Sequence, residues 1–232
     1  MRYIYIKSYL PMELKLVVPT SLDEITLEQY QRFARIEGDE EFRQKKMLEI
    51  FCQVPFAELP KVRLVDATNV LTVLSKTLNQ KPELTKFFEL KGTKYGFIPA
   101  LNDISLGEFV DLDNYMKDWA TMHRAMAVLY RPVTKEKGER YDIEDYTPDE
   151  DREELFKQMP VSVALGAMVF FYRLGNVLAA HTLSSLAKQV KTSTQEKPSS
   201  GSDGDGIPAS MLWLQEMSQN LRQSLDYLFI NV

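Results

Sequence analysis

Apolar and polar residues alternate at the start of the chain and then change to a helical spacing. Residues 3–7 and 14–18 repeat with a period of two, which predicts two short strands joined by a turn. Thr26 then precedes an apolar stripe with Gln29 three residues later. This is the spacing of a capping box, which satisfies free amide groups at a helix start. We therefore expect a β-hairpin followed by a helix that Gly38 ends.

Two more helical stripes precede the next predicted strands. One covers about residues 40–53, and the other begins near Asp66, with apolar residues at spacings of three and four. The run KFFELKGTKYGFI then places two β-prone segments around Lys91 and Gly92. Because glycine adopts the positive φ that a tight turn needs, this run predicts a second β-hairpin.

The long segment after this hairpin carries a second helix-start motif. Ser105 and Glu108 have the capping-box spacing, and two apolar stripes continue beyond them, with a break expected near Asp118. Two apolar faces indicate contact on both sides, so we expect a central helix. Arg131 and Pro132 indicate a stop signal, with a cation near the negative end of the helix.

A polar run and two further helices complete the main body. KEKGERYDIEDY predicts a polar hairpin or loop, and an acidic helix start follows it. Pro160 opens a nearly continuous apolar helix, in which Ala164, Gly166 and Ala167 favour close approach of a neighbouring helix. The pattern predicts a mainly α (α+β) fold over residues 1–190, a helical domain with small β-hairpins.

The composition changes after residue 190. KTSTQEKPSSGSDGDG holds no large apolar residue, which predicts a flexible linker over 191–207. Residues 208–232 predict an amphipathic helix with one apolar stripe. The stripe consists of Met211, Leu214, Met217, Leu221, Leu225 and Leu228. This helix either folds back to complete the core or binds a groove on a partner or another copy, and the long linker favours a partner.

Composition and charge exclude several classes of protein. The chain is 44% apolar and 26% charged, as globular proteins are, and its net charge is −5 with bases and acids interleaved. This argues against nucleic-acid binding. No apolar run approaches the roughly 20 residues that cross a bilayer, and no signal peptide is evident. We expect a soluble intracellular protein without a membrane partner, in which the lone Cys52 is a buried thiol.

Residues that could carry chemistry are scattered. His123 and His181 lie on different predicted helices without partners at metal-ligand spacing, so each is expected in a core or on a helix surface. Asp111, Asp113 and Asp118 lack the glycine and glutamate of a calcium loop and fit caps or a solvated helix face. We expect no catalytic residue, no metal and no cofactor.

Four motifs resemble those of tailed-bacteriophage morphogenesis proteins: ITLEQYQRF, KYGFIP, ISLGEFVDLD and MHRAMAVLYRP, within about residues 25–186. The last two are similar to the tail assembly chaperone class. In that class a Ser/Thr-Leu-Gly-Glu-aromatic phrase precedes a helix that ends in Leu-Tyr-Arg. The matching positions here are 105–112 and 127–131.

The resemblance implies a non-enzymatic assembly factor in the host cytoplasm. Such a chaperone covers apolar helical segments of the tape measure protein until the tail tube polymerises around it. Two alternatives remain, namely a virion structural protein (neck, connector or baseplate subunit) and a host-directed regulator that binds a bacterial enzyme. A homo-oligomer is compatible with each, and the partner-binding residues we expect are the six of the stripe in 208–232.

Overall fold

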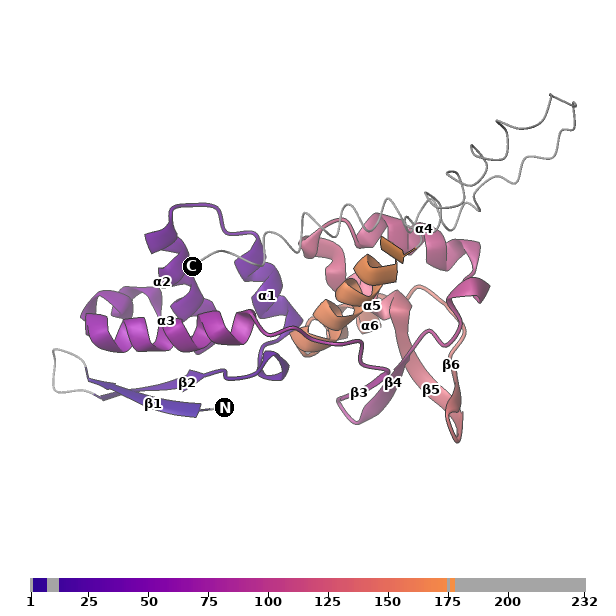
Figure 1. Cartoon of the computed structure of the whole chain (residues 1–232), viewed down its shortest axis with the longest axis horizontal. Helices are drawn as coiled ribbons and strands as arrows, with labels where there is room; N and C mark the ends of the chain where they lie inside the picture. The colour runs from indigo at the N-terminus through magenta and orange to yellow at the C-terminus, as the bar shows by residue number, and fades with distance from the viewer. Residues whose placement is uncertain (1, 8–12, 175, 178–232) are drawn as a thin grey trace, which may run out of the picture.

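The computed structural model describes residues 2–7, 13–174 and 176–177, which form a mainly helical fold with two antiparallel sheets. Figure 1 shows an elongated molecule, with a helical half at one end and a half built on a four-stranded sheet at the other. The predicted mainly α fold with small β-hairpins is confirmed for these residues. The predicted linker 191–207 and helix 208–232 lie outside the described residues.

The helical half contains the first hairpin and the first three helices. Its elements are β1 (Arg2–Lys7), β2 (Glu13–Val18), η1 (Leu22–Glu24), α1 (Leu27–Ala34), α2 (Glu40–Cys52), η2 (Phe56–Lys61) and α3 (Leu64–Leu78). The capping box is present, because the Gln29 amide donates to the Thr26 hydroxyl at 3.2 Å and the Thr26 amide donates to Gln29 Oε1 at 2.9 Å. α1 ends at Ala34, before Gly38, which was predicted to end it. The chain turns more tightly after Ala34.

The other half is built on a sheet of strand order β3-β4-β5-β6. Its elements are β3 (Phe87–Leu90), β4 (Thr93–Phe97), η3 (Leu101–Asp103), α4 (Leu106–Tyr115), η4 (Trp119–Thr121), α5 (Met122–Leu129), β5 (Tyr130–Lys137), β6 (Arg140–Ile143), α6 (Glu150–Phe156) and a helix over 161–174. The second predicted β-hairpin, β3 and β4, lies beside β5 and β6, which form at the segment predicted as a polar hairpin or loop. Lys91 and Gly92 have φ angles of 51° and 81°, as a type I′ turn requires.

The central helical region follows the prediction, but its end leads directly into a strand. It breaks between α4 and η4, as expected, and α5 ends at Leu129. The predicted helix stop before Arg131 and Pro132 is confirmed, because α5 ends at Leu129. The chain then passes directly into β5, where the Arg131 side chain pairs with Glu108 and does not serve as the expected cation of the helix end. Pro132 pairs with Tyr95 of β4, and Arg131 is a buried strand residue.

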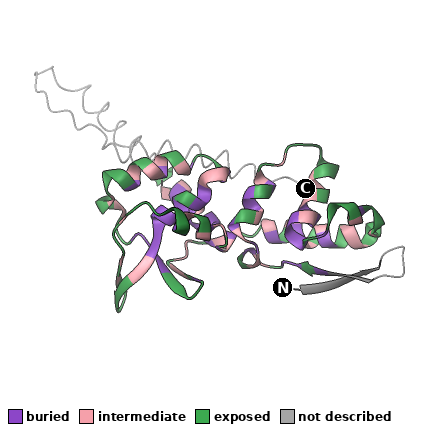
Figure 2. Cartoon of the chain, turned by 180° about the vertical axis from the view of Figure 1, so that it is seen from behind, coloured by how far each residue is buried: buried purple, intermediate pink, exposed green. Residues whose placement is uncertain are grey.

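Aromatic rings fill the space between the sheet and the helices that cover it. The ring centroid of Phe97 lies 5.3 Å from that of Tyr130 and 5.8 Å from that of Phe170. The Tyr95 ring lies 4.9 Å from Phe156 in an edge-to-face arrangement. Figure 2 shows β5 passing from buried at its start to exposed at the hairpin tip. The base of the sheet is therefore the densely packed part of this half.

A glycine in the helix 161–174 admits the chain segment that precedes β3. A Cβ atom at Gly166 would lie 2.2 Å from the carbonyl oxygen of Glu83. At Gly166, the one of the three small residues whose close neighbours are defined, that neighbour is the irregular segment around Glu83.

Backbone hydrogen bonds at the start of α1 join the two halves. The Leu27 amide donates to the Met159 carbonyl at 2.9 Å, and the Val161 amide donates to the Ile25 carbonyl at 2.9 Å. These bonds link residues far apart in sequence. They fix α1 against the corner between α6 and the helix 161–174.

Candidate functional site

The helical half contains an apolar groove of about 440 Å³ between α1, α2 and α3. Its apolar lining residues are Tyr30, Phe33, Ala34, Met47, Leu71 and Leu78. Polar side chains of α2 and α3, among them Arg43 and Lys76, complete its walls. The volume falls within the range of roughly 300–1,000 Å³ that is typical of binding pockets.

The groove exists because α1 and α2 cover only part of the apolar stripe of α3. Val70 and Leu74 are fully buried, whereas Leu71 and Leu78, on the adjoining side of the same helix, are half-buried. The spacing of apolar residues predicted these helices. It did not predict which apolar positions stay uncovered, because that depends on the angles at which the helices pack.

Aromatic contacts hold the floor of the groove in place. The Tyr30 ring lies 4.6 Å from Trp119 of the sheet half, and the Phe33 ring lies 5.2 Å from Phe51. The Arg43 guanidinium lies 5.9 Å from the Phe33 ring centroid, within the range of a cation–π contact. The floor is therefore supported from behind, and Tyr30 connects it to the other half.

Further apolar side chains are exposed on the same helices. Leu64 and Val65, in the first turn of α3, are 81% and 69% exposed. Phe42 and Phe56 are also exposed, and the Lys46 ammonium lies 5.7 Å and 4.8 Å from their ring centroids. Gathered exposed apolar residues commonly mark contacts with another macromolecule.

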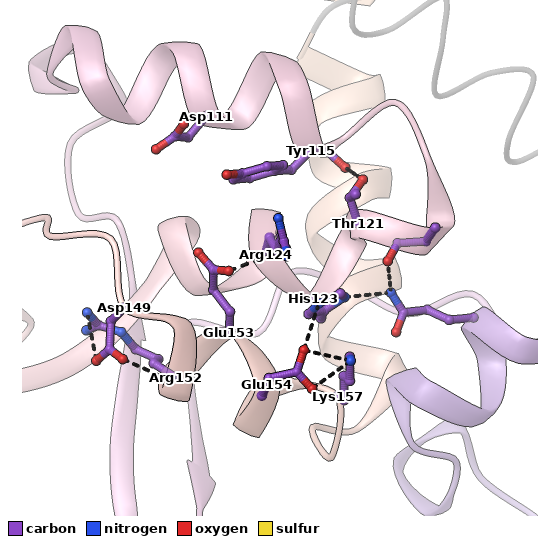
Figure 3. A network of polar contacts seen from close by, with 12 residues as sticks. Asp111, Tyr115, Thr121, His123, Arg124, Asp149, Arg152, Glu153, Glu154 and Lys157 are labelled. Atoms are coloured by element: carbon purple, nitrogen blue, oxygen red, sulfur yellow. Dashed lines mark hydrogen bonds and ion pairs between the residues drawn. The ribbon is translucent and has the colours of Figure 1, made fainter.

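A polar network at the joint between the halves is the second candidate site (Figure 3). Gln31 Nε2 of α1 donates to the Trp119 carbonyl oxygen at 2.5 Å and lies 3.0 Å from His123 Nδ1. Since the amide nitrogen is the donor, the neutral ring carries its proton on Nε2. His123 Nε2 lies 3.9 Å from Glu154 Oε1, and Lys157 Nζ donates to the same carboxylate at 2.6 Å.

Burial sets the protonation state of His123. The residue is 4% exposed, and burial lowers the pKa of its imidazole to about 4, with the Lys157 cation acting in the same direction and Glu154 against it. The ring is therefore neutral at pH 7 and serves as a hydrogen-bond acceptor. His123 lies in the core, which is one of the two places expected for it.

The acidic residues of the central region do not converge on one point. Asp111 accepts from the Tyr146 hydroxyl, Asp113 pairs with a lysine one turn later, and Asp118 caps the first turn of η4. Asp113 and Asp118 occupy the solvated helix face and the cap that we expected, whereas Asp111 is half-buried against Tyr146. Within residues 2–7, 13–174 and 176–177, no group of three His, Cys, Asp or Glu residues could hold a metal ion. His181 lies outside those residues.

A buried ion pair that the sequence reasoning missed ties α4 to the sheet. Glu108 Oε2 accepts from the Ser105 amide at 2.6 Å, as the capping box predicts, while its Oε1 lies 2.7 Å from Arg131 Nη2. Both side chains are 7% exposed. In the part of the chain that the structure describes, Arg131 Nε has no hydrogen-bond partner, and the guanidinium lies 5.8 Å from the Tyr146 ring. The sequence signal that could have indicated this buried pair was a charged residue, Arg131, between two apolar runs.

Two further sequence predictions concern Cys52 and the apolar stripe of residues 208–232. Cys52 is buried, as expected, and burial raises the pKa of its thiol to about 12, which keeps the nucleophilic thiolate scarce at pH 7. The six predicted partner-binding residues of the stripe lie outside the described residues. The groove is therefore the candidate for an apolar binding surface among the described residues.

The chain matches no family model, no curated protein and no solved structure. No helix in the described ranges has the length and apolar character needed to cross a bilayer. The interpretation of the groove therefore depends on its own geometry and chemistry.

Proposed function

We propose that this chain is a non-enzymatic bacteriophage assembly factor, a tail assembly chaperone that binds helical segments of the tape measure protein. The observation that supports the proposal is the apolar groove between α1, α2 and α3. Grooves of this kind take the apolar face of an amphipathic helix. The resemblance of ISLGEFVDLD and MHRAMAVLYRP to the tail assembly chaperone class supplies the phage context.

The dimensions of the groove suit a short helical segment. Its lining on α3 runs from Thr68 to Asn79, a helical length of about 17 Å, which corresponds to about three turns of a partner helix. Each buried Leu or Met side chain contributes about 1.5–3 kcal/mol, and ordering of the partner offsets part of that gain. The result is reversible binding, which a chaperone needs in order to release its client.

The polar network supports packing in this proposal and performs no reaction. Neutral His123 is held by Gln31, and Glu154 is held by Lys157, so each polar group has a structural partner. The proposal locates the protein in the host cytoplasm, where the tape measure protein is made. A homo-oligomer is compatible with the same groove.

Affinity capture from infected cells tests the proposal. Full-length protein with Leu71→Glu carries a charge in the groove wall, whereas Asn69→Glu places the same charge on an exposed position of α3 outside the groove lining. We expect the native chain and Asn69→Glu to recover the tape measure protein, and Leu71→Glu to recover at least about tenfold less. Equal recovery with both variants, or none with the native chain, would refute the proposal.

Purified phage particles separate the proposal from the two alternatives. A tail assembly chaperone is absent from finished particles, whereas a neck, connector or baseplate subunit is retained in fixed stoichiometry. A host-directed regulator would instead recover a bacterial enzyme in the capture experiment. Mass spectrometry of both samples distinguishes the three outcomes.

A further inference from the structure

The apolar groove between α1, α2 and α3 and the apolar stripe of residues 208–232 have matching lengths. The groove accommodates about three helical turns, and the stripe offers Leu214, Met217, Leu221 and Leu225 at spacings of three and four over the same length. A groove with an apolar floor and a segment with one apolar face are complementary partners in the helix-in-groove mode.

The connecting chain is long enough to bring the two together. Thirty residues, 178–207, lie between the described part of the chain and residue 208. The predicted flexible linker within this stretch is 191–207, and a Gly/Ser-rich chain of those 17 residues has a root-mean-square span of about 23 Å and a maximum of about 60 Å. A span of this order keeps the local concentration of the segment near millimolar, above that of any partner in solution.

The charges of the two surfaces are also complementary. The groove lining carries Arg43 and Lys76 against Glu40, which makes it locally positive by one charge in a chain of net charge −5. Residues 208–232 carry two carboxylates and one guanidinium, a net charge of −1. A segment of this sign is attracted to the groove, although most of the surrounding protein is acidic.

We propose that residues 208–232 occupy the groove within the same molecule and compete there with the partner helix. This regulation depends on the proposed function, because it concerns the same groove. A partner helix then binds only by displacing the segment, so weak apolar peptides are rejected and the groove is covered when no client is present.

Disulfide trapping in the full-length chain tests the proposal. Ser75 lines the groove, and Ser218 lies on the apolar face of the predicted helix, between Leu214 and Leu221. With both replaced by cysteine, we expect an intramolecular disulfide that forms at least about tenfold faster than in the matched pair Ser75→Cys with Gln223→Cys, whose second cysteine is on the opposite face. The native Cys52 is buried and does not interfere.

Each outcome of the trapping experiment decides between occupants. Equal rates for the two pairs overturn the proposal, and disulfides that form only between molecules and increase with concentration assign the groove to a second copy. Thr72→Cys provides a second groove position, because it is exposed and so does not depend on repacking if Ser75→Cys fails to fold.

A competition measurement separates failure of this inference from failure of the proposed function. The probe is a synthetic helical peptide of the tape measure protein, with Leu214→Glu and Leu221→Glu introduced into the full-length chain. We expect those changes to tighten peptide binding by about tenfold, because they remove the internal competitor. Peptide binding that is sensitive to Leu71→Glu but unchanged by these substitutions supports the function and overturns the competition. Fast disulfide formation without any peptide binding supports occupation of the groove by residues 208–232 and overturns the proposed function.

Discussion

The two halves of the molecule differ in how closely their interiors are packed, although both expose single apolar side chains, such as Leu106 of α4 and Leu64 of α3. In the sheet half, the rings of Tyr95, Phe97 and Phe156 fill the space between the sheet and its helices. In the helical half, α1, α2 and α3 are backed by a two-stranded hairpin and leave a groove. In the sheet half two layers cover each other's apolar faces, whereas Leu71 and Leu78 of α3 stay half-buried at the groove. The helical half therefore retains partly uncovered apolar surface at the groove.

We expect the largest loss of stability at Gly166, where the sheet half is tightly packed. Gly166→Val should lower the free energy of unfolding by about 4 kcal/mol or more, because even its Cβ would lie 2.2 Å from a backbone oxygen of Glu83. Urea denaturation measures the loss. Gly107→Ala is the control, since its Cβ would have its nearest neighbour at 3.8 Å and alanine favours the helix. Similar losses for the two variants would mean that the segment around Glu83 does not pack against this helix.

The buried ion pair should give the next largest effect. Glu108→Gln keeps a capping side chain but leaves Arg131 as an uncompensated buried charge, so we expect a loss of about 3 kcal/mol. Adding Arg131→Met removes that charge, and the double variant should recover most of the stability. Equilibrium denaturation of the four proteins in the cycle measures the coupling. A loss below about 1 kcal/mol for Glu108→Gln would show that water reaches the pair.

The joint between the halves should respond to pH through His123. Burial lowers the pKa of the folded-state imidazole to about 4, against an ordinary value of 6.5. Between these values the unfolded chain binds more protons, so stability is complete above pH 6.5 and falls as the pH decreases towards 4. The loss should reach about 2–3 kcal/mol. His123→Gln keeps an acceptor for Gln31 but does not titrate, and its unfolding free energy should change less over the same pH interval. If the unfolding free energy of both proteins depended equally on pH, His123 would not be the group that causes the loss of stability.

Exposed apolar positions of the helical half should give the smallest effect. Leu64→Ala should change the free energy of unfolding by less than about 0.5 kcal/mol, because Leu64 is 81% exposed. Leu74→Ala, on the buried side of the same helix, should cost about 3 kcal/mol. Thermal denaturation of the pair measures the contrast. A large loss at Leu64 would mean that a neighbouring chain already covers the first turn of α3.

The local parts of the fold could be predicted from the sequence. The caps at Thr26 and Ser105 and the turn at Lys91–Gly92 depend on residues within three or four positions of each other. Their hydrogen bonds and backbone angles follow from local chemistry. This is why the elements and the fold class were predicted while their arrangement was not.

The contacts that define the candidate sites could not be predicted in this way. Arg131 finds Glu108, and Gln31 finds His123, only after the sheet and helices have packed. The groove likewise depends on the angles between α1, α2 and α3, for which the apolar spacing in each helix carries no information. The helix stop before Arg131 was predicted, but the strand that follows it directly was not, because a helix end has the same local pattern whether a loop or a strand comes next.

The direct passage from α5 into β5 has a consequence for changes in chain length. Leu129 ends the helix and Tyr130 begins the strand, so no loop lies between them to absorb an extra residue. One insertion there would rotate α5 by about 100° relative to β5, or shift the strand by one position and turn its inward side chains outward. At Gly138 a Cβ would meet nothing within 4 Å, so the tip of the next hairpin has room. Insertions and deletions in related chains should therefore accumulate at that tip and be absent from the helix-to-strand junction.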